Sequence, residues 1–510
     1  MRGAGGREMT NADNNKRKVK DEREGKSKNN GPDNAAATMK SSAAVALMPQ
    51  NGHRAVGGRP DTPAASERRA QGKTLREAVP RTSHAGWKAP EDRRDPIDLL
   101  IESNQGRVLE LIPTRFGRMM QSPFTFYRGS AAIMAADLAT TAQSGLQVQA
   151  CGDAHLLNFG GFATPERNIV FDINDLDETL PAPWEWDVKR LTASIVIAGQ
   201  YLRLSETDSA RAAAATVRAY RQRMANYSSM RALDVWYDTI GVDAVAEAVD
   251  DRVRVAMKQR VETAQEKSSP EFAFPKLVEH RGAEPRFKDD PPLIYHPSAE
   301  MAPGIATAFR EPLARYRASL PDHVRVLLDR YRLRDVAIKV VGIGSVGTFC
   351  AIGLLIAAED DPLFLQVKEA RASVLEPYAG KSIYKNAGQR VVNGQHLMQS
   401  ASDVFLGWTT GENGRDFYLR QLRDVKISAI IEDWDPGMLR EYGKLCAWAL
   451  AKAHARSGDA AQIAGYMGAS SVFDEAICEF AVEYADQNQR DYRAFIKAVR
   501  EGRLKAIADA

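Results

Sequence analysis

Two short stretches, in each of which an apolar run leads into a loop rich in Asp, Asn and Gly, constrain this chain more than any other feature. The first is CGDAHLLNFG at 151–160 and the second is VFDINDLDET at 170–179. The runs LQVQA and NIVF before the acidic residues are typical of strands. Clustered carboxylates repel one another and are usually tolerated only around a cation or a basic partner. The sequence therefore predicts two neighbouring strand ends that share a metal and phosphate site.

The spacing within the two motifs assigns roles to their residues. Asp153 and Asn158 stand five residues apart, the spacing of the catalytic Asp and the metal-binding Asn in a kinase catalytic loop. Magnesium prefers oxygen ligands and keeps several waters, so one carboxylate and one amide oxygen suffice beside phosphates. We predict Asn158 and Asp172 as metal ligands, and Asp153 as the group that orients an acceptor hydroxyl. Asp175 is either a second metal ligand or an acceptor that stabilises the loop.

These motifs resemble the GDxHxxN and IDF-x-D pattern of aminoglycoside and choline kinases. More closely, residues from about 95 to 505 resemble the bacterial domain of unknown function 2252, an uncharacterised kinase-like family. The resemblance implies a kinase-like fold and a nucleotide site, without a settled substrate. It also implies that Asp187 hydrogen-bonds the backbone of the catalytic loop and that His155 packs that loop. The other stretches that carry it are FTFYRG at 124–129, WEWDVKRL at 184–191, VGIGSVGT at 341–348, LQVKEARASVLEPY at 365–378 and AKAHARSGD at 451–459.

A glycine-rich turn and a lysine-bearing strand follow in the C-terminal half. VGIGSVGT places Gly342, Gly344 and Gly347 around Ser345 as G-x-G-x-x-G, and Lys368 comes 21 residues after the last glycine. Glycine lets the backbone approach phosphate oxygens without a Cβ in the way, and a lysine on a neighbouring strand then meets the α- and β-phosphates. We predict these five residues as nucleotide contacts. The same glycine spacing also occurs in ordinary turns and in dinucleotide sites.

The acidic partner of Lys368 is expected on the helix that follows the strand. Glu369 and Glu376 are available, and both come sooner after the lysine than in a typical protein kinase. We predict Glu376, because a helix can turn it back toward the strand. Arg128 in FYRG is expected either to contact a phosphate or to pair with a surface carboxylate.

Charge and cysteine content narrow the partners. Residues 1–90 hold 18 Lys and Arg against 9 Asp and Glu, whereas residues 91–510 hold 51 basic and 57 acidic residues. The mildly acidic remainder predicts no nucleic-acid partner for the folded part. The four cysteines lack C-x-x-C spacing, so neither a zinc site nor a disulfide framework is predicted, and a cytoplasmic location is expected. No apolar run approaches the roughly 20 residues that span a membrane, so no membrane partner is expected.

Composition and periodicity divide the chain into four parts. Residues 1–94 are expected to be a disordered basic tail, because they bury too little apolar surface to offset their ordering entropy. A helical lobe with the catalytic and metal motifs is expected at 95–333, and a β-rich nucleotide lobe at 334–430. Helices at 431–510 are expected to pack on the helical lobe. The predicted fold is α+β, kinase-like and two-lobed, with five antiparallel strands at about 335–430, whereas the Pro-rich residues 268–300 are expected to be irregular.

The order of the parts departs from that of a kinase, because the glycine turn follows the catalytic loop by almost 190 residues. We interpret the order as a circular permutation in which the two lobes form one cleft and Lys368 lies near Asp172. The helix at 438–456 is then expected to pack on the helix at 187–203 and to bury Leu445, Trp448 and Leu450. The alternative is two independent domains that never share a ligand.

Together these expectations describe an enzyme that uses ATP and Mg²⁺ to transfer a phosphoryl group to a small molecule. Only fourteen residues separate Asp172 from Asp187, fewer than a protein kinase needs to dock a peptide, which favours a small acceptor. Two alternatives stay open at this point. One is a regulatory module that binds a nucleotide without turnover, and the other is a nucleotidyl transferase on the same scaffold.

Overall fold

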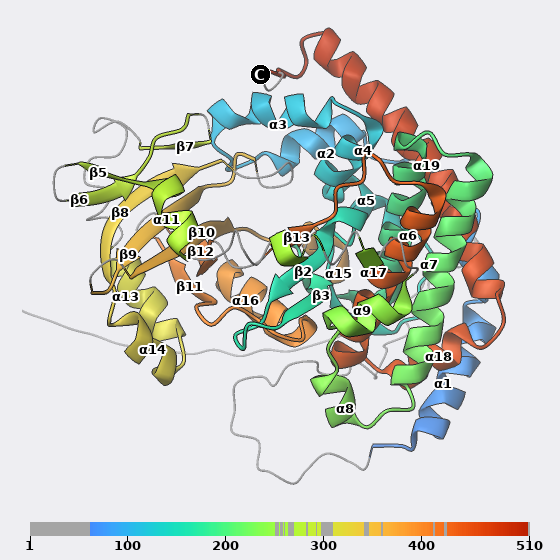
Figure 1. The fold of residues 1–510 in the computed structure, drawn as a ribbon. Helices are drawn as coiled ribbons and strands as arrows, with labels where there is room; N and C mark the ends of the chain where they lie inside the picture. Colours follow the sequence, from blue (N-terminus) through green and yellow to red (C-terminus); the bar gives the residue numbers. More distant parts are fainter. Residues whose placement is uncertain are drawn as a thin grey trace, which may run out of the picture. The chain divides into compact units, whose positions relative to one another are not determined.

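The structure is a computed structural model and describes residues 62–249, 254–255, 259, 261–263, 270–281, 284–291, 293–296, 310–340, 346–358, 361–411, 414–422 and 426–507. The predicted nucleotide contacts Gly342, Gly344 and Ser345 lie outside these residues. The helices, drawn in Figure 1, are α1 (Ala65–Ala78), α2 (Pro96–Ser103), α3 (Ile112–Met119), α4 (Pro123–Gly129), α5 (Ala131–Leu138), α6 (Trp184–Tyr201), α7 (Glu206–Tyr227), α8 (Ala232–Tyr237), α9 (Val242–Ala248), α11 (Pro270–Leu277), α13 (Arg310–Ser319), α14 (Asp322–Leu328), α15 (Glu376–Ala379), α16 (Ala387–Met398), α17 (Pro436–Ser457), α18 (Ala460–Met467) and α19 (Val472–Arg500). The strands are β1 (Gln147–Ala150), β2 (Phe159–Ala163), β3 (Ile169–Ile173), β4 (Leu180–Pro183), β5 (Val278–Arg281), β6 (Glu284–Phe287), β7 (Ile294–Tyr295), β8 (Arg332–Lys339), β9 (Cys350–Ile356), β10 (Pro362–Ala370), β11 (Gly407–Thr410), β12 (Asp416–Gln421) and β13 (Lys426–Ser428).

Helix α1 lies inside the range 1–94 that composition assigns to a disordered tail. It packs on α18 so closely that a Cβ on Gly72 would lie 2.0 Å from the carbonyl oxygen of Gln462. Arg76 Nε donates a hydrogen bond to the carbonyl oxygen of Tyr466 at 2.8 Å. Close backbone approach and arginine hydrogen bonds hold this helix, rather than a broad apolar face, so the composition of the segment gave no sign of its order. Order therefore begins before Asp95.

Four helices, α6, α7, α17 and α19, form the main apolar core. Helix α17 packs on α7 and α6, and α19 packs on the same two helices. Leu445, Trp448 and Leu450 of α17 are buried, which confirms the predicted packing of this helix on the one at 187–203. Helix α17 thus belongs to the same core as α6, from which more than 200 residues of chain separate it. None of the described helices is long and apolar enough to cross a membrane.

A six-stranded antiparallel sheet, the β lobe, has the order β11-β12-β10-β9-β8-β7 (Figure 1). Strands β8 to β12 are the five strands predicted at about 335–430. The sixth, β7, comes from the stretch predicted to be irregular, and it pairs with the end of β8. Lys368 of β10 lies in the middle of the sheet, opposite Cys350 of β9 and Tyr418 of β12. The sheet therefore fixes the lysine between two neighbouring strands.

A second antiparallel sheet, β13-β2-β3, connects the end of the β lobe to the first motif. Strand β13 follows β12 along the chain, but it pairs with β2, which begins directly after Asn158. Strand β3 pairs with the other edge of β2 and leads into the second motif. The remaining strands form two short antiparallel pairs, β1-β4 and β5-β6. The chain is thus a mixed α+β fold with several antiparallel sheets, which confirms the α+β part of the prediction.

Candidate functional site

The first loop, residues 151–158, joins β1 to β2, and a carboxylate of α6 holds its start. The backbone N–H groups of Cys151 and Gly152 donate to the two oxygens of Asp187 at 2.6 and 2.9 Å. Nε2 of His454 lies 3.1 Å from the same carboxylate. Gly152 has φ +79°, a conformation that favours glycine. The predicted hydrogen bonds between Asp187 and the loop backbone are confirmed.

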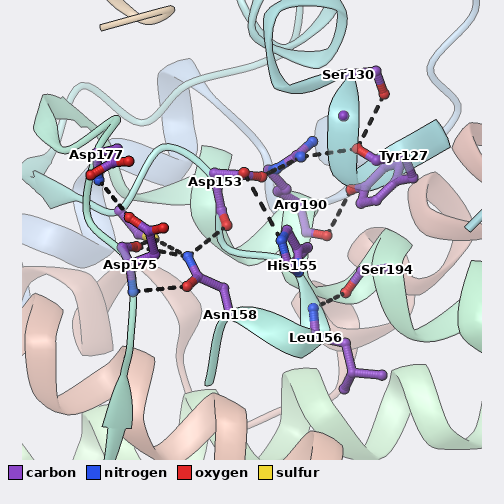
Figure 2. A network of polar contacts seen from close by, with 12 residues as sticks. Tyr127, Ser130, Asp153, His155, Leu156, Asn158, Asp175, Asp177, Arg190 and Ser194 are labelled. Carbon is purple, nitrogen blue, oxygen red and sulfur yellow. Dashed lines mark hydrogen bonds and ion pairs between the residues drawn. The ribbon is translucent and has the colours of Figure 1, made fainter. Parts of the chain in front are cut away.

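Asn158 ties the first loop to the second loop, residues 174–179. Its Nδ2 donates to the carbonyl oxygens of Asp153 at 3.1 Å and Asp175 at 2.8 Å. Its Oδ1 accepts a hydrogen bond from the backbone N–H of Asp175 at 2.9 Å. Figure 2 shows the amide between the two loops. The two motifs therefore meet at one place, at neighbouring strand ends.

The carboxylate of Asp153 pairs with a buried arginine. Arg190 Nε donates to Asp153 Oδ1 at 2.8 Å, and Arg190 Nη2 binds the same oxygen (Figure 2). The Asp153 side chain stays 23% exposed, whereas that of Arg190 is 2% exposed. Burial alone would lower the pKa of Arg190, but the charge of Asp153 outweighs it and raises the pKa. Burial lowers the pKa of His155, whose Nε2 lies 4.0 Å from Asp153, to about 4, so His155 is neutral at pH 7.

The structure corrects the predicted role of Asp172 as a metal ligand. Its side chain is fully buried within β3 and forms an ion pair with Nζ of Lys452, on α17. The backbone N–H and the hydroxyl of Ser400 both donate to Asp172 Oδ2 at 2.9 Å, and the N–H of Ile173 donates to Oδ1 at 3.0 Å. Both carboxylate oxygens thus have protein partners. The Asp172 side chain thus lies on the face of β3 that is turned toward α17, where Lys452 pairs with it.

Three residues further on, the second loop meets Lys368 of the β lobe. Lys368 Nζ lies 2.7 Å from Asp177 Oδ2 and 3.4 Å from Asp175 Oδ2. The hydroxyl of Tyr418 donates to Asp177 Oδ1 at 2.6 Å. The lysine side chain is 4% exposed, whereas the Asp175 side chain is 40% exposed. Asp175 is therefore the more exposed of the two carboxylates, since the Asp177 side chain is 29% exposed.

The surroundings of the second loop shift the pKa values of its two carboxylates in opposite directions. Burial would raise the pKa of Asp175, but the charges of Lys368 and Arg420 outweigh it and hold that pKa below its usual value. Burial and the neighbouring charge of Asp175 raise the pKa of Asp177. Lys368 stays protonated, because these carboxylates raise its pKa more than burial lowers it. The ionised form is therefore favoured more strongly at Asp175 than at Asp177.

The structure also corrects the predicted pairing of Lys368 with Glu376. Glu376 begins the one-turn helix α15, and its Oε1 accepts a hydrogen bond from the backbone N–H of Ser373 at 3.3 Å. A helix of a single turn caps its own first residues and does not turn this carboxylate back toward β10. Asp177 takes the place that the sequence analysis gave to Glu376. The alternative, Glu369, instead accepts from the backbone N–H of Phe349 at 3.0 Å.

Gly347 is the predicted glycine contact that the structure describes. Its carbonyl oxygen accepts a hydrogen bond from the N–H of Val108 at 2.7 Å, and Arg107 Nη1 donates to the carbonyl oxygen of Val346 at 2.6 Å. The end of the glycine turn therefore contacts the segment that follows α2. It lies at the boundary between the β lobe and the helices.

Sequence reasoning missed three residues of the site. Arg190 follows Asp187 by three residues, and residues three apart lie on the same face of a helix. The sequence therefore did carry a signal that places Arg190 beside the first loop. Tyr418 and Arg420 lie on β12, and Arg420 Nη1 is 3.4 Å from the carbonyl oxygen of Asn174. More than 240 residues separate the members of these contacts, and a single tyrosine or arginine in a strand carries no signal of its own.

Within the described part of the chain, no group of three or more His, Cys, Asp or Glu side chains is placed to hold a metal ion. Asp175, and the buried Asn158 whose amide is hydrogen-bonded to the Asp175 backbone, do carry oxygen donors of the kind that magnesium prefers. Oδ1 of Asn158 has a second lone pair besides the one that the N–H of Asp175 uses. The donor set suits a cation that also takes phosphate oxygens and water, rather than one bound by protein alone.

The fold and the site define a class of protein: an α+β chain in which two acidic loops and a strand lysine from distant parts of the sequence form one charged site. The chain belongs to the family described as uncharacterized proteins conserved in bacteria (DUF2252), whose model matches residues 107–498. The match includes both acidic loops, Lys368 and helix α17. No curated protein matches the chain, and no solved structure does.

Proposed function

We propose that this protein is an ATP- and magnesium-dependent phosphotransferase that acts on a small-molecule acceptor. The observation that carries the proposal is the contact of Lys368 with Asp177 and Asp175, across 191 and 193 positions of sequence. Kinases bring together the same three parts: a lysine on a strand, an acidic loop that binds metal, and a catalytic loop with an Asp and an Asn. Phosphoryl transfer depends mainly on positioning and charge stabilisation, which such a site provides.

Each residue then has a role that its surroundings support. Asp153, held by Arg190 and partly exposed, orients the acceptor hydroxyl and takes its proton. Asp175 and the amide oxygen of Asn158 hold magnesium, and Lys368 holds the phosphates. Magnesium, when bound, neutralises charge that develops on the phosphate oxygens. In this assignment Asp175 replaces Asp172, and the glycine turn that ends at Gly347 covers the phosphates.

The order of the elements supports a circularly permuted kinase arrangement. From β8 to α17 the chain runs through the glycine turn, strand β9, the lysine strand β10, helices α15 and α16, three more strands and then α17. The hydroxyl of Tyr442, on α17, donates to the carbonyl oxygen of Phe159 at 2.6 Å, directly after the first loop. A circular permutation creates its two new chain ends at a single cut, so these two ends are expected to lie close together. Arg503 forms ion pairs with Asp95 and Asp98, so the segments just before and just after the matched region 107–498 are neighbours.

Helix α16 occupies the place where a kinase carries the acidic partner of its lysine, yet it has no acidic residue. Its Arg390 instead donates to the carbonyl oxygens of Asp177 and Arg371, at 2.7 and 2.8 Å. The arginine thus holds the backbone of the second loop, whose Asp177 side chain pairs with Lys368 from the other side. The link between helix and lysine is retained, with Asp177 between them.

The binding test is a calorimetric titration of the full chain with a non-hydrolysable ATP analogue, with and without Mg²⁺. The wild type is expected to bind more tightly with Mg²⁺, and Asp175→Asn is expected to lose this difference. Lys368→Met is expected to bind at least about tenfold more weakly, because a charge-assisted hydrogen bond is worth more than one factor of ten. Asp172→Asn is the matched control and should keep the Mg²⁺ dependence in the folded fraction. A wild type that binds no nucleotide in either condition contradicts the proposal.

One observation favours the second candidate, a regulatory module that binds nucleotide without turnover. Oδ1 of Asp153 already accepts hydrogen bonds from Nε and Nη2 of Arg190, so this oxygen is less available to an acceptor hydroxyl. The wild type and Asp153→Asn are therefore compared for Mg²⁺-dependent release of label from γ-labelled ATP. A phosphotransferase shows release in the wild type that is lost in the variant, while nucleotide binding survives. Binding without release in the wild type identifies the regulatory module.

A further inference from the structure

Arg128, the last but one residue of α4, is a largely covered arginine beside the site. Its Nε is buried and has no hydrogen-bond partner among the described residues. Helix α4 itself is well anchored, since a capping box between Ser122 and Thr125 begins it. Arg115 Nη2 donates to the carbonyl oxygen of Gly129 at 2.7 Å and fixes its end. The position of Arg128 is thus defined by its helix, although its Nε has no hydrogen-bond partner among the described residues.

The backbone of α4 lies two hydrogen bonds away from Asp153. Arg190 Nη2 binds Asp153 Oδ1 and also donates to the carbonyl oxygen of Tyr127 at 3.2 Å. The hydroxyl of Tyr127 donates in return to the carbonyl oxygen of Arg190 at 2.8 Å (Figure 2). The peptide group that Tyr127 shares with Arg128 is therefore part of the network that holds Asp153.

The carboxylates near Arg128 do not balance its positive charge. Burial lowers its pKa, and the carboxylates that oppose this effect are Asp153 and Glu432. Asp153 is already neutralised by Arg190, and Glu432 is exposed to solvent. His155 is neutral at pH 7 and adds no charge. A half-buried guanidinium without a close partner is unfavourable, and its planar donors match the oxygens of a phosphate or a carboxylate.

We propose that Arg128 binds an anionic group, a phosphate or a carboxylate, carried by the acceptor molecule. That the bound molecule is the acceptor rests on the proposed function, whereas the anion site itself does not. The acceptor side is favoured because Lys368 and Arg420, the cations suited to the nucleotide, adjoin Asp175 and Asp177. Arg128 instead adjoins Asp153, which orients the acceptor hydroxyl. The substrate class is then a hydroxyl compound that carries a negative charge.

The test measures binding of inorganic phosphate, and separately of acetate, to the full chain that is saturated with Mg²⁺ and a non-hydrolysable ATP analogue. The wild type is expected to bind one of these anions. Arg128→Met is expected to bind it at least about tenfold more weakly, since one charge-assisted hydrogen bond exceeds a factor of ten. Arg128→Lys, which keeps the charge without the planar fork, should lie between them and remains informative if the Met variant fails to fold. Arg218→Met, on the exposed face of α7, is the matched control and should bind as the wild type does.

The outcomes separate the two proposals. Equal anion binding by the wild type and Arg128→Met overturns the inference, as does a wild type that binds neither anion. Anion binding that the nucleotide analogue abolishes assigns Arg128 to the nucleotide phosphates and overturns the acceptor role. Arg128-dependent anion binding by a chain that binds no nucleotide overturns the phosphotransferase proposal and leaves the anion site standing.

Discussion

At the scale of single residues, Asp172 and Asp175 lie only three positions apart at the end of one strand. Asp172 nevertheless forms an ion pair in the core, whereas Asp175 is a carboxylate of the candidate site. Asp172 and Lys452 are both fully buried, so removal of either charge leaves the other unpaired in the interior. We expect Lys452→Met to lower the free energy of unfolding by about 3–5 kcal/mol, measured by urea denaturation. Lys497→Met removes an exposed ion pair to Glu501 and should change it by less than about 1 kcal/mol. Equal effects of the two substitutions would contradict this assignment.

The buried histidines predict a pH dependence of stability. Burial lowers the pKa of His155 to about 4 and that of His84 to about 3, below the roughly 6.5 of an unfolded chain. Below about pH 6.5 the unfolded chain binds protons that the folded protein does not, so the free energy of unfolding falls as the pH falls from about 6.5 to about 4. Above that window both histidines are neutral in both states and contribute no slope.

Urea denaturation at pH 7, 6, 5 and 4.5 checks this expectation, because carboxylates common to all variants cancel in the comparison. The fall in stability should be smaller in His155→Asn and in His84→Asn than in the wild type. A wild-type slope in both buried-histidine variants would show that neither histidine is held neutral.

The residue scale also shows what a sequence can and cannot predict about this site. Asp153 and Asn158 belong to one short loop, so their spacing in the sequence is enough to predict that they lie close together. The choice between Asp172 and Asp175 depends on where the strand ends and which face each side chain takes, and both residues are carboxylates. Arg420 and Tyr418 enter only because two distant strands meet the second loop, which no local pattern records.

At the scale of elements, α1 shows the same limit, because its contact with α18 depends on small residues rather than apolar ones. We expect Gly72→Ala to weaken this contact by about 1–3 kcal/mol, since the added Cβ would lie 2.0 Å from a carbonyl oxygen. Amide hydrogen exchange should then show faster exchange in α1 and α18. Gly241→Ala, where a Cβ meets nothing within 4 Å, is the control and should leave exchange unchanged. Unchanged exchange in Gly72→Ala would mean that the two helices separate without cost.

Strands were easier to predict than their partners. The apolar runs of β8, β9 and β10 are strong local signals, and β10 is buried along almost its whole length. The two-residue strand β7 has no such pattern and is held by its pairing with β8. Likewise β13 carries only three residues and joins β2 rather than its neighbour in sequence, β12. Short strands are stabilised by the sheet that they join, so their own residues do not predict them.

At the scale of the whole molecule, the question is whether the two halves of the chain are one folding unit or two independent domains. Helix α17 comes late in the sequence but buries its apolar face against α7 and α6. The ion pairs of Lys368 with the second loop and of Lys452 with Asp172 also join the halves. A half that lacks these partners exposes a large apolar surface and leaves buried charges unpaired.

We therefore expect neither half to fold alone when the chain is expressed as two fragments, residues 62–296 and 310–507. Each fragment alone should unfold without a cooperative transition, because the core around α17 is divided between them. Mixed together, the fragments should regain a cooperative transition and, under the proposed function, Mg²⁺-dependent nucleotide binding. A second fragment with Leu450→Asp is the control and should fail to associate, since that side chain is fully buried in the shared core. If either fragment alone melts cooperatively at the temperature of the intact chain, the halves are independent domains, and a site shared between them loses its structural basis.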